Sequence, residues 1–351
     1  MTLTVLSIAY PLAAVGPNAV GGSEQILAAL DRALVAAGYR SIVIACEGSE
    51  VAGELMSYPA PPPGHINRPF HAARQADIRA ATDAVLAREH VDVIHMHGLD
   101  FFEVMPPPGL PMLATLHLPP DWYPDAALNP VRPRSWVHCV SQSQASRTVS
   151  PVLLSPIPNG VPVTALGAVH PKRCGYALAL ARICPEKGLH HALDAAHAAR
   201  TSLMIGGQVF PYAAHEAYFR DEIAPRLDRR RRFLGPLGFA KKRRLLAAAR
   251  CLLIPSLVAE TSSLVAMEAA ACGTPVIAFR IGALPEVVEH GRTGFIVDDA
   301  AGMASALARV EEIDPETCRD TARRRFGLDG MVAAYFARYH RMAHDPSALA
   351  A

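Results

Sequence analysis

Residues 256–299 read SLVAETSSLVAMEAAACGTPVIAFRIGALPEVVEHGRTGFIVDD, and this stretch decides the fold. It follows the apolar run CLLIP, which predicts a short buried strand. Residues 261–263 are threonine and serines, which commonly begin helices, and the next residues predict a helix over about 264–272. Gly273, with a proline two residues later, predicts where that helix ends. The stretch is therefore expected to be a βα unit.

Two glutamates flank the predicted helix start. Glu260 precedes it, and Glu268 lies one turn beyond Leu264. At a rise of 1.5 Å per residue the two carboxylates should be roughly 10 Å apart, about the span from the hexose to the ribose of a nucleotide sugar. No glutamate or glutamine forms a capping box, so backbone N–H groups at the helix start remain available for a diphosphate. The alternative is that both glutamates are ordinary solvated helix residues.

The motifs follow one another in a recognisable order: E-x7-E, then A-C-G-T-P-V-I-A, G-x-x-P-E-V-V and G-x-T-G-F-x-V-D. This run resembles the donor half of the retaining family 4 glycosyltransferases. The resemblance implies the GT-B fold, an α/β architecture of two Rossmann-like domains facing each other across a cleft, with a C-terminal helix that crosses back to the first domain. It also implies that Glu260 holds the sugar hydroxyls and Glu268 the ribose.

One segment departs from the family pattern. Where the family usually has Glu-Pro-Phe-Gly-Leu, this chain has E-T-S-S-L. The resemblance still implies donor contacts from the residues after the glutamate, namely Thr261, Ser262, Ser263 and Leu264. Ser263 carries a Cβ where glycine allows the closest approach of a sugar, so the pattern does not specify the donor.

Length and composition limit the other classes of function. A chain of 351 residues fits two domains, and 51% hydrophobic with 19% charged residues indicates a globular protein. The net charge of +2 gives no overall attraction to nucleic acid. Seven cysteines without a C-x-x-C motif argue against a disulfide framework and a structural zinc site, and favour a cytoplasmic location. The N-terminal segment is expected to be a strand rather than a signal peptide, and no apolar run approaches the roughly 18 residues of a membrane span.

The chain opens with a βαβ pattern: strand 3–10, helix 23–37 and strand 41–45. Its loop lacks G-x-G-x-x-G, which argues against a nicotinamide cofactor. Gly21 and Gly22 begin a G-G-S-E run that resembles the family's G-G-x-E, which implies a position near the donor phosphates and the acceptor. Adjacent glycines before a helix also occur as simple flexible turns.

Three histidines end predicted strands of the first half. Strand 91–95 leads into His95 and His97, which resemble the family's D-V-I-H-x-H. These two could face the same way, but no carboxylate or third histidine stands at a convincing spacing, so no metal site is predicted. His117 follows strand 113–116, and its T-x-H pattern resembles the family motif whose histidine faces the donor sugar. A packed histidine is the alternative.

The second half opens with strand 176–181 and the motif R-I-C-P-E-K-G. It resembles the family's R-x-x-x-E-K-G, which implies that Arg182 and Lys187 neutralise the leaving diphosphate. Two cations after a strand can offset that charge without a metal. The basic runs at 229–232 and 241–244 are interpreted as solvated faces rather than polyanion sites.

The boundaries follow from the turn-rich run SPIPNGVP and from the aromatic pattern near the C-terminus. We expect an acceptor-binding domain over 1–165 and a donor domain over 174–325. Aromatic residues at helical spacing over 323–342 predict a terminal helix, and a crossover helix and tail should occupy 326–351.

The sequence thus predicts a retaining, metal-independent transferase that moves a hexose from a UDP- or GDP-linked sugar and requires no cofactor. The acceptor is a glycan, a lipid-linked molecule or a small molecule, and nucleic acid is excluded as a partner. Peripheral contact with a membrane is left open. The rival hypotheses are an epimerase or glycan phosphorylase on a similar two-domain plan, and a non-catalytic nucleotide-sugar binder. Slow donor hydrolysis would separate an enzyme from a binder.

Overall fold

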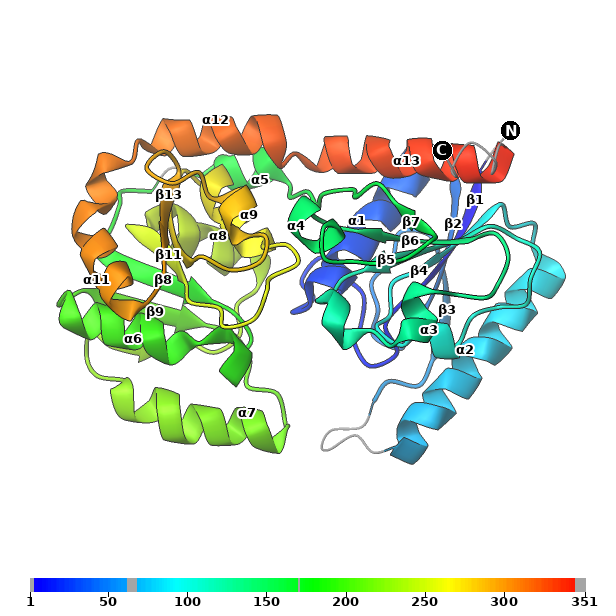
Figure 1. Ribbon diagram of the computed structural model, residues 1–351, viewed down its shortest axis with the longest axis horizontal. Helices are drawn as coiled ribbons and strands as arrows, with labels where there is room; N and C mark the ends of the chain where they lie inside the picture. The colour runs from blue at the N-terminus through cyan, green and yellow to red at the C-terminus, as the bar shows by residue number, and fades with distance from the viewer. Residues whose placement is uncertain (1–2, 62–67, 170, 345–351) are drawn as a thin grey trace. The chain divides into compact units, whose positions relative to one another are not determined.

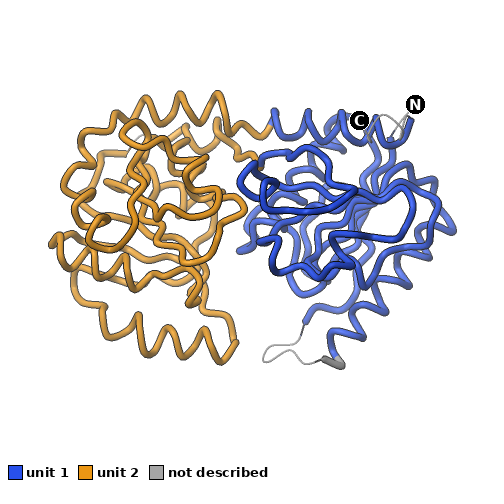
Figure 2. Tube along the Cα trace, viewed as in Figure 1, with its two compact units in different colours: residues 1–158, 329–351 blue, residues 159–328 orange. Residues whose placement is uncertain are grey.

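The computed structural model describes residues 3–61, 68–169 and 171–344, and it divides into two compact units (Figure 2). One unit comprises the residues up to Pro158 together with those from Asp329 onward, and the other comprises Asn159–Leu328. The sequence-based boundaries stood at 165 and 326. The chain therefore returns to its first unit at the end, as the pattern predicted, while the tail after His344 lies outside the described residues.

The first unit is built on a sheet of seven parallel strands in the order β3-β2-β1-β4-β5-β6-β7 (Figure 1). The strands are β1 Thr4–Ile8, β2 Arg40–Cys46, β3 Glu54–Tyr58, β4 Val93–Met96, β5 Met112–Leu116, β6 Ser135–Cys139 and β7 Leu153–Leu154. The helices are α1 Gly22–Ala36, α2 Arg68–Arg88, α3 Asp125–Leu128, α4 Gln142–Ala145 and α13 Leu328–His344, with short 3-10 turns η1 Phe101–Glu103 and η2 Pro120–Trp122.

The second unit repeats this plan with six parallel strands in the order β10-β9-β8-β11-β12-β13. The strands are β8 Tyr176–Leu180, β9 Ser202–Gly206, β10 Arg231–Phe233, β11 Cys251–Ile254, β12 Val276–Phe279 and β13 Gly294–Val297. The helices are α5 Val163–Gly167, α6 Leu189–Ala198, α7 Ala213–Tyr218, α8 Phe239–Ala248, α9 Leu264–Ala271, α10 Leu284–Val287, α11 Ala300–Arg309 and α12 Pro315–Arg325. Four short turns complete it: η3 Pro185–Lys187, η4 Phe219–Ile223, η5 Ala224–Arg226 and η6 Val310–Glu312.

The central strands β8, β11 and β12 of the second unit are buried on both faces, as expected of a parallel sheet covered by helices on both sides. Leu252 and Ile254 of β11 join one core cluster with residues of α8, α9 and α12. The alternate residues Cys251 and Leu253 join another cluster with residues of α6 and α11. Successive side chains on a strand point to opposite faces, so the continuous apolar run predicted this burial.

In each sheet, the direction in which successive strands are added along the sheet reverses at one point. In the first unit the order reverses between β1 and β4, and in the second between β8 and β11. In open parallel sheets, ligands bind beyond the carboxyl ends of the strands at such a reversal. The loops that follow β8 and β11 are therefore the first place to look for a site in the second unit.

The terminal helix differs from its prediction. The aromatic pattern predicted one helix over 323–342, but α12 ends at Arg325 and α13 begins at Leu328. The break has a backbone cause, since the N–H of Val161 donates to the carbonyl of Phe326 at 2.8 Å and the N–H of Leu328 donates to the carbonyl of Val161 at 3.1 Å. The carbonyl of Phe326 and the N–H of Leu328 are both bonded to Val161, so neither is available for the hydrogen bonds that would continue a helix.

The first basic run also differs from its prediction. It was interpreted as a solvated face, but Arg231 belongs to β10, is only 6% exposed and pairs with Asp228 at 2.9 Å. Its second guanidinium nitrogen donates to the carbonyl of Ala196 at 2.8 Å. The strand begins inside the run, so one arginine of the four lies against the sheet while its neighbours Arg230 and Arg232 stay exposed.

Helix α13 is held on the first unit by a chain of buried hydrogen bonds. Tyr339 contacts His95 Nδ1 at 2.7 Å, His95 Nε2 contacts Thr115 Oγ1 at 2.7 Å, and Thr115 Oγ1 contacts His138 Nε2 at 2.7 Å. The chain ends at the carbonyl of Cys139, 3.0 Å from His138 Nδ1. His95, Thr115, His138 and Tyr339 are all fully buried.

The direction of this chain follows from its last acceptor. A carbonyl only accepts, so the proton of His138 is on Nδ1 and its Nε2 accepts from the Thr115 hydroxyl. That hydroxyl then accepts from His95 Nε2, and His95 Nδ1 accepts from Tyr339. Both histidines of this hydrogen-bond chain, His95 and His138, are neutral. A second proton on either ring would point at a group that already donates to that ring. Burial lowers the pKa of His138 to about 3 and holds the pKa of His95 well below its usual range.

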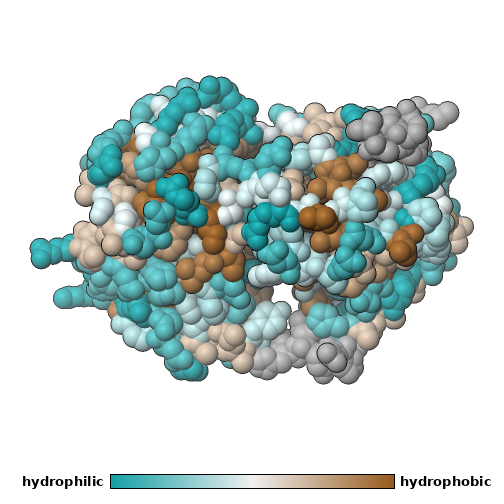
Figure 3. Space-filling model, viewed as in Figure 1, coloured by the Kyte–Doolittle hydropathy of each residue, from teal (hydrophilic) through white to brown (hydrophobic). Residues whose placement is uncertain are grey.

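The face of the molecule in Figure 3 is mostly hydrophilic, with hydrophobic residues in small separate groups. Within the described ranges, no helix is both long and apolar enough to cross a membrane.

The histidine chain predicts a loss of stability in acid. Between pH 6.5 and the lowered folded pKa of His138, the unfolded chain binds a proton that the folded chain does not, so stability present above pH 6.5 is lost as the pH falls. Each such histidine should cost about 1.4 kcal/mol per pH unit. Denaturant titrations between pH 7 and 5 would measure the slope.

A substitution of His138 tests this assignment, and a substitution of an exposed histidine is the control. His138→Gln should flatten the pH slope by about one proton, whereas His90→Gln, at a side chain that is 83% exposed, should leave it unchanged. Equal slopes in wild type and His138→Gln would contradict this assignment.

Candidate functional site

The loops after β8 and β11 dock onto each other through their backbones. The N–H of Leu257 donates to the carbonyl of Glu186 at 2.9 Å. Gly188 adopts φ +58°, and a Cβ there would lie 2.2 Å from the carbonyl oxygen of Pro255. The glycine of the E-K-G motif is therefore required by this close approach as well as by its left-handed conformation.

This docking brings Lys187 and Glu260 together. Lys187 Nζ lies 2.5 Å from a carboxylate oxygen of Glu260, and the two side chains are only 20% and 13% exposed. The Ser256 hydroxyl donates to the same carboxylate oxygen. Two predicted site residues that stand 73 positions apart in the chain thus form one hydrogen-bonded pair at the strand-order reversal.

The backbone of Gly282 packs against the backbone of Glu260. Gly282 adopts φ +56°, and a Cβ there would lie 2.4 Å from both the backbone nitrogen and the backbone oxygen of Glu260. The N–H of the next residue, Ala283, donates to the Glu260 carbonyl at 2.8 Å. The glycine of the G-x-x-P-E motif therefore allows a close backbone contact that fixes the position of Glu260.

Arg182 is a second cation on the loop that carries Lys187. It leaves β8 two residues beyond the last strand position and is partly buried. Within the described part of the chain, its guanidinium makes no hydrogen bond or ion pair. The site therefore holds one cation paired with Glu260 and one cation available to an anionic ligand.

Helix α9 begins directly after these residues. Ser263 is its N-cap residue, is 5% exposed, and makes no side-chain capping bond. Ser262 Oγ is buried and has no hydrogen-bond partner among the described residues. Thr261 and Leu264 flank them and are partly buried. A helix N-terminus without a side-chain cap, with an unsatisfied hydroxyl beside it, is suited to a polar or anionic group.

Glu268 lies in α9 and is nearly fully buried. Its carboxylate accepts from Lys242 Nζ at 2.5 Å, with the side chains 5% and 17% exposed. Burial raises the pKa of Glu268, and the Lys242 ammonium opposes that rise. The glutamate is thus not a solvated helix residue, which excludes the alternative considered from the sequence.

Lys242 was missed by the sequence analysis, which assigned the run 241–244 to a solvated face. In α8, Lys241 and Arg244 are exposed, but Lys242 lies one turn before the buried Leu246. Residues at i and i+4 share a face of a helix, and that spacing was the signal available in the sequence.

The glycines of the first loop lie in the other unit. Gly21 is the N-cap residue of α1, and Gly22 is its first residue. A Cβ on Gly21 would lie 1.8 Å from a carboxylate oxygen of Glu24, which is itself only 4% exposed. The Glu24 carboxylate therefore packs against Gly21, and a negative charge in the first turn is favourable to the helix.

His117 also lies in the first unit, directly after β5. Its Nε2 is 3.1 Å from Nδ1 of His97, and the two rings stack at a centroid distance of 5.4 Å. Burial lowers the pKa of His117 to about 4, so it is a neutral hydrogen-bonding group near pH 7. His97 Nε2 is buried without a partner among the described residues.

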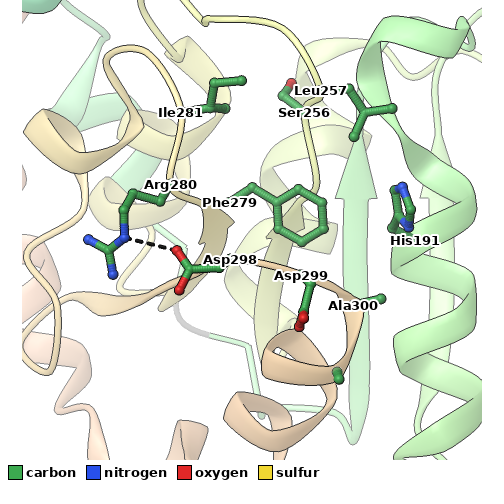
Figure 4. Close-up of a pocket in the computed structure, with 10 residues that line it drawn as sticks. His191, Ser256, Leu257, Phe279, Arg280, Ile281, Asp298, Asp299 and Ala300 are labelled. Carbon is green, nitrogen blue, oxygen red and sulfur yellow. Dashed lines mark hydrogen bonds and ion pairs between the residues drawn. The ribbon is translucent and has the colours of Figure 1, made fainter.

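A cavity of about 560 Å³ opens beside the β11 loop on the α6 and α11 side (Figure 4). Ser256 and Leu257 contribute to it, but Lys187, Glu260 and Glu268 do not line it. Arg280 pairs with Asp298 at 3.0 Å inside it, and Asp299 already caps α11 through the N–H of Gly302. The residues assigned to the donor from the sequence therefore lie outside the lining of this cavity.

Comparison with known proteins identifies relatives for both halves of the chain. The family model described as Glycosyltransferase Family 4 matches residues 20–165, and the model described as Glycosyl transferases group 1 matches residues 174–312. A D-inositol 3-phosphate glycosyltransferase of Corynebacterium efficiens is 40% identical over 33% of this chain and 28% of its own length. An alpha-maltose-1-phosphate synthase of Mycobacterium tuberculosis is 32% identical over 46% of this chain and 48% of its own length. The chain thus spans less than half the length of these relatives.

Solved structures share the fold over nearly the whole chain. Sucrose-phosphate synthase from Thermosynechococcus elongatus superposes with a TM-score of 0.77 at 21% identity, covering 97% of this chain and 99% of its own. HepE from Anabaena, solved in complex with UDP-glucose, superposes with a TM-score of 0.72 at 18% identity, covering 96% of this chain and 100% of its own. The predicted fold class is confirmed.

The Lys242 and Glu268 pair predicts a non-additive mutant cycle. Lys242→Met should cost about 3–5 kcal/mol of unfolding free energy, because it leaves a buried carboxylate without its partner. Lys242→Met combined with Glu268→Gln should recover at least half of that loss, since no unpaired charge remains. Denaturant unfolding at pH 7 of the wild type, of the single variants Lys242→Met and Glu268→Gln, and of the double variant completes the cycle.

The neighbouring exposed residue provides the control. Lys241→Met should change stability by less than about 0.5 kcal/mol. A single Lys242 variant as stable as the wild type, or a double variant no more stable than that single variant, would show that the pair does not stabilise the fold.

Proposed function

Because the chain belongs to the family 4 glycosyltransferases, whose models match residues 20–165 and 174–312, we propose that it transfers a hexose from a nucleoside diphosphate sugar to an acceptor. The observation that carries this proposal is the Lys187 and Glu260 pair at the β8 and β11 reversal. It joins a cation suited to a diphosphate with a carboxylate suited to sugar hydroxyls, directly before the N-terminus of α9.

The leaving group sets the electrostatic requirement. When the bond between the sugar and the diphosphate breaks, negative charge develops on the departing phosphate oxygen. Arg182 and Lys187 supply two positive charges after β8, and the N-terminus of α9 supplies backbone donors. Groups held in place before the reaction stabilise this charge without reorganisation, which is the most effective form of such stabilisation.

The two glutamates are assigned to opposite ends of the donor. Glu260 is oriented by Lys187 and by the Ser256 hydroxyl, and its remaining lone pairs can accept from sugar hydroxyls. Glu268 accepts from Lys242 and retains lone pairs for the ribose hydroxyls. The unsatisfied Ser262 hydroxyl is available to the groups between them.

The stereochemistry and metal requirement are part of the same proposal. The family resemblance supports retention of the anomeric configuration by front-face attack, in which no protein carboxylate acts as a nucleophile. The two cations at 182 and 187 make a metal unnecessary for departure of the diphosphate. No cofactor is required.

Other parts of the proposal concern the unit of β1 to β7. We assign the acceptor to this unit, where Gly21, Gly22 and His117 were predicted to serve the donor and acceptor. His117, being neutral, would position the sugar by hydrogen bonding rather than by charge. UDP-glucose is the first donor to test, since HepE was solved with it, and GDP-linked sugars are the second.

The donor assignment predicts different roles for the two glutamates. Glu268→Gln should weaken binding of the free nucleoside diphosphate by about 1.5–3 kcal/mol and remove most of the preference for ribo over 2′-deoxy nucleotide, because a charge-assisted hydrogen bond is lost. Glu260→Gln should leave that affinity nearly unchanged while reducing transfer. Calorimetric titration with UDP and 2′-deoxy-UDP distinguishes them, and equal losses in both variants would refute the assignment.

The leaving-group assignment predicts a barrier effect at Lys187. Lys187→Ala should raise the activation barrier by about 2–4 kcal/mol, measured as kcat/KM for donor turnover in chelator-treated protein. Lys241→Ala, at an exposed lysine of α8, is the matched control and should retain wild-type values. Unchanged kcat/KM in Lys187→Ala would eliminate the leaving-group role, and turnover restored only by Mg²⁺ would eliminate metal independence.

The same assay separates the enzyme from its rivals. A glycosyltransferase without its acceptor hydrolyses the donor slowly, whereas a non-catalytic binder releases the donor intact. An epimerase would release a sugar of altered configuration, either free or still attached to the nucleotide. Chromatography of the products would detect that change.

A further inference from the structure

Three potential metal ligands meet beside η3, outside the residues assigned to the donor. Cys184 is the residue before η3, Glu186 lies within it, and His215 lies in α7. One ligand atom from each, the sulfur, a carboxylate oxygen and a ring nitrogen, all lie within 4.8 Å of one another. Among the residues that the structure describes, no other group of this kind occurs.

The backbone holds these three residues in place. The N–H of Ile183 donates to the carbonyl of Gln208 at 3.0 Å, which ties the loop after β8 to the loop that leads into α7. The N–H of Lys187 donates to the carbonyl of Cys184 at 3.1 Å. The N–H of His215 donates to the carbonyl of Tyr212 at 2.9 Å, and the two rings meet edge to face at 5.1 Å. The cluster is therefore fixed by main-chain contacts on both sides.

One side chain of the cluster has an unused coordinating atom, and another already contacts its neighbour in the cluster. Nδ1 of His215 is buried and has no hydrogen-bond partner among the described residues. Cys184 is 1% exposed, and its thiol contacts the carbonyl of Arg182 at 3.7 Å and the carboxylate of Glu186, another member of the cluster. A buried ring nitrogen without a partner is costly unless something binds it.

We propose that Cys184, Glu186 and His215 form a binding site for a divalent transition metal ion of the zinc class. A thiolate, an imidazole nitrogen and a carboxylate are all ligands that Zn²⁺ accepts, and three protein ligands with a water in the fourth position make a complete tetrahedral set. Mg²⁺ and Ca²⁺ prefer oxygen ligands, so a set with sulfur and nitrogen disfavours them. The thiol proton leaves to solvent when the metal binds, and no other bond changes.

The charges around the cluster indicate its role. The thiolate and the Glu186 carboxylate together balance a divalent cation, while Arg182 and Lys187 lie close enough to reduce its affinity. The ion would connect α7 to η3, the turn that carries Lys187. It stabilises the second unit and is not needed for sugar transfer, so the site is consistent with turnover in the presence of a chelator.

Metal binding to the chelator-treated, reduced full-length chain tests the proposal. Titration with Co²⁺ should produce a thiolate-to-cobalt charge-transfer band that saturates at one ion per chain, and Zn²⁺ should displace the Co²⁺ and raise the melting temperature. Cys184→Ser should abolish the band. Glu186→Gln, an isosteric change at a partly exposed residue, and His215→Gln should each weaken binding at least 10–100-fold, since loss of a direct ligand costs no less than loss of an outer partner.

Matched controls separate this site from adventitious binding. Cys174→Ser removes the one cysteine that is exposed, and Glu216→Gln removes the carboxylate next to His215, and both should leave the titration unchanged. His340 and His344 stack on α13 and could bind metal, but they lack a thiol and would give no charge-transfer band. Absence of the band in wild type, its loss in Cys174→Ser, or wild-type affinity in a folded Glu186→Gln variant would each overturn the proposal.

Discussion

The candidate site depends on the contact between two backbone loops at the strand-order reversal of the second unit. Because the N–H of Leu257 is bonded to Glu186 and Gly188 lies against Pro255, the chain after β8 and the chain after β11 cannot move independently. A lysine and a carboxylate placed on these loops therefore meet at 2.5 Å without either side chain needing a partner elsewhere. The parallel sheet supplies this arrangement, since strands that are neighbours in space deliver their carboxyl ends to one edge.

The fold was predictable where local signals agreed with the sheet. The helix α9 and its end at Gly273, with φ +76°, follow from the apolar pattern and from the glycine's conformational freedom. The break between α12 and α13 was not predictable, because it depends on backbone bonds to Val161, which is remote in sequence. Strand β3 was also missed, since most of its residues are exposed or partly buried at the sheet edge and give no apolar run.

The candidate site was predictable to the extent that its residues stand in motifs. Lys187 and Glu260 were found from two separate runs, and their contact follows from strand order rather than from either run alone. Lys242 stands in a run of four basic residues. Only its position on the buried face of the helix, one turn before Leu246, distinguishes it from the exposed residues of that run. The group of Cys184, Glu186 and His215 has no spacing that a sequence motif would reveal, because a loop and a helix from different parts of the unit bring it together.

The balance of charge in the second unit argues for an anionic ligand. Each buried carboxylate near α9 already has a lysine, Glu260 with Lys187 and Glu268 with Lys242, and both pairs are largely removed from water. Removing two charges from water is expensive, and the cost is offset only if the geometry and further hydrogen bonds are good. The pairs thus satisfy the carboxylates, while Arg182, the N-terminus of α9 and the Ser262 hydroxyl still have unused capacity to bind negative charge. A diphosphate would supply what these groups lack, whereas a neutral sugar alone would leave them unsatisfied.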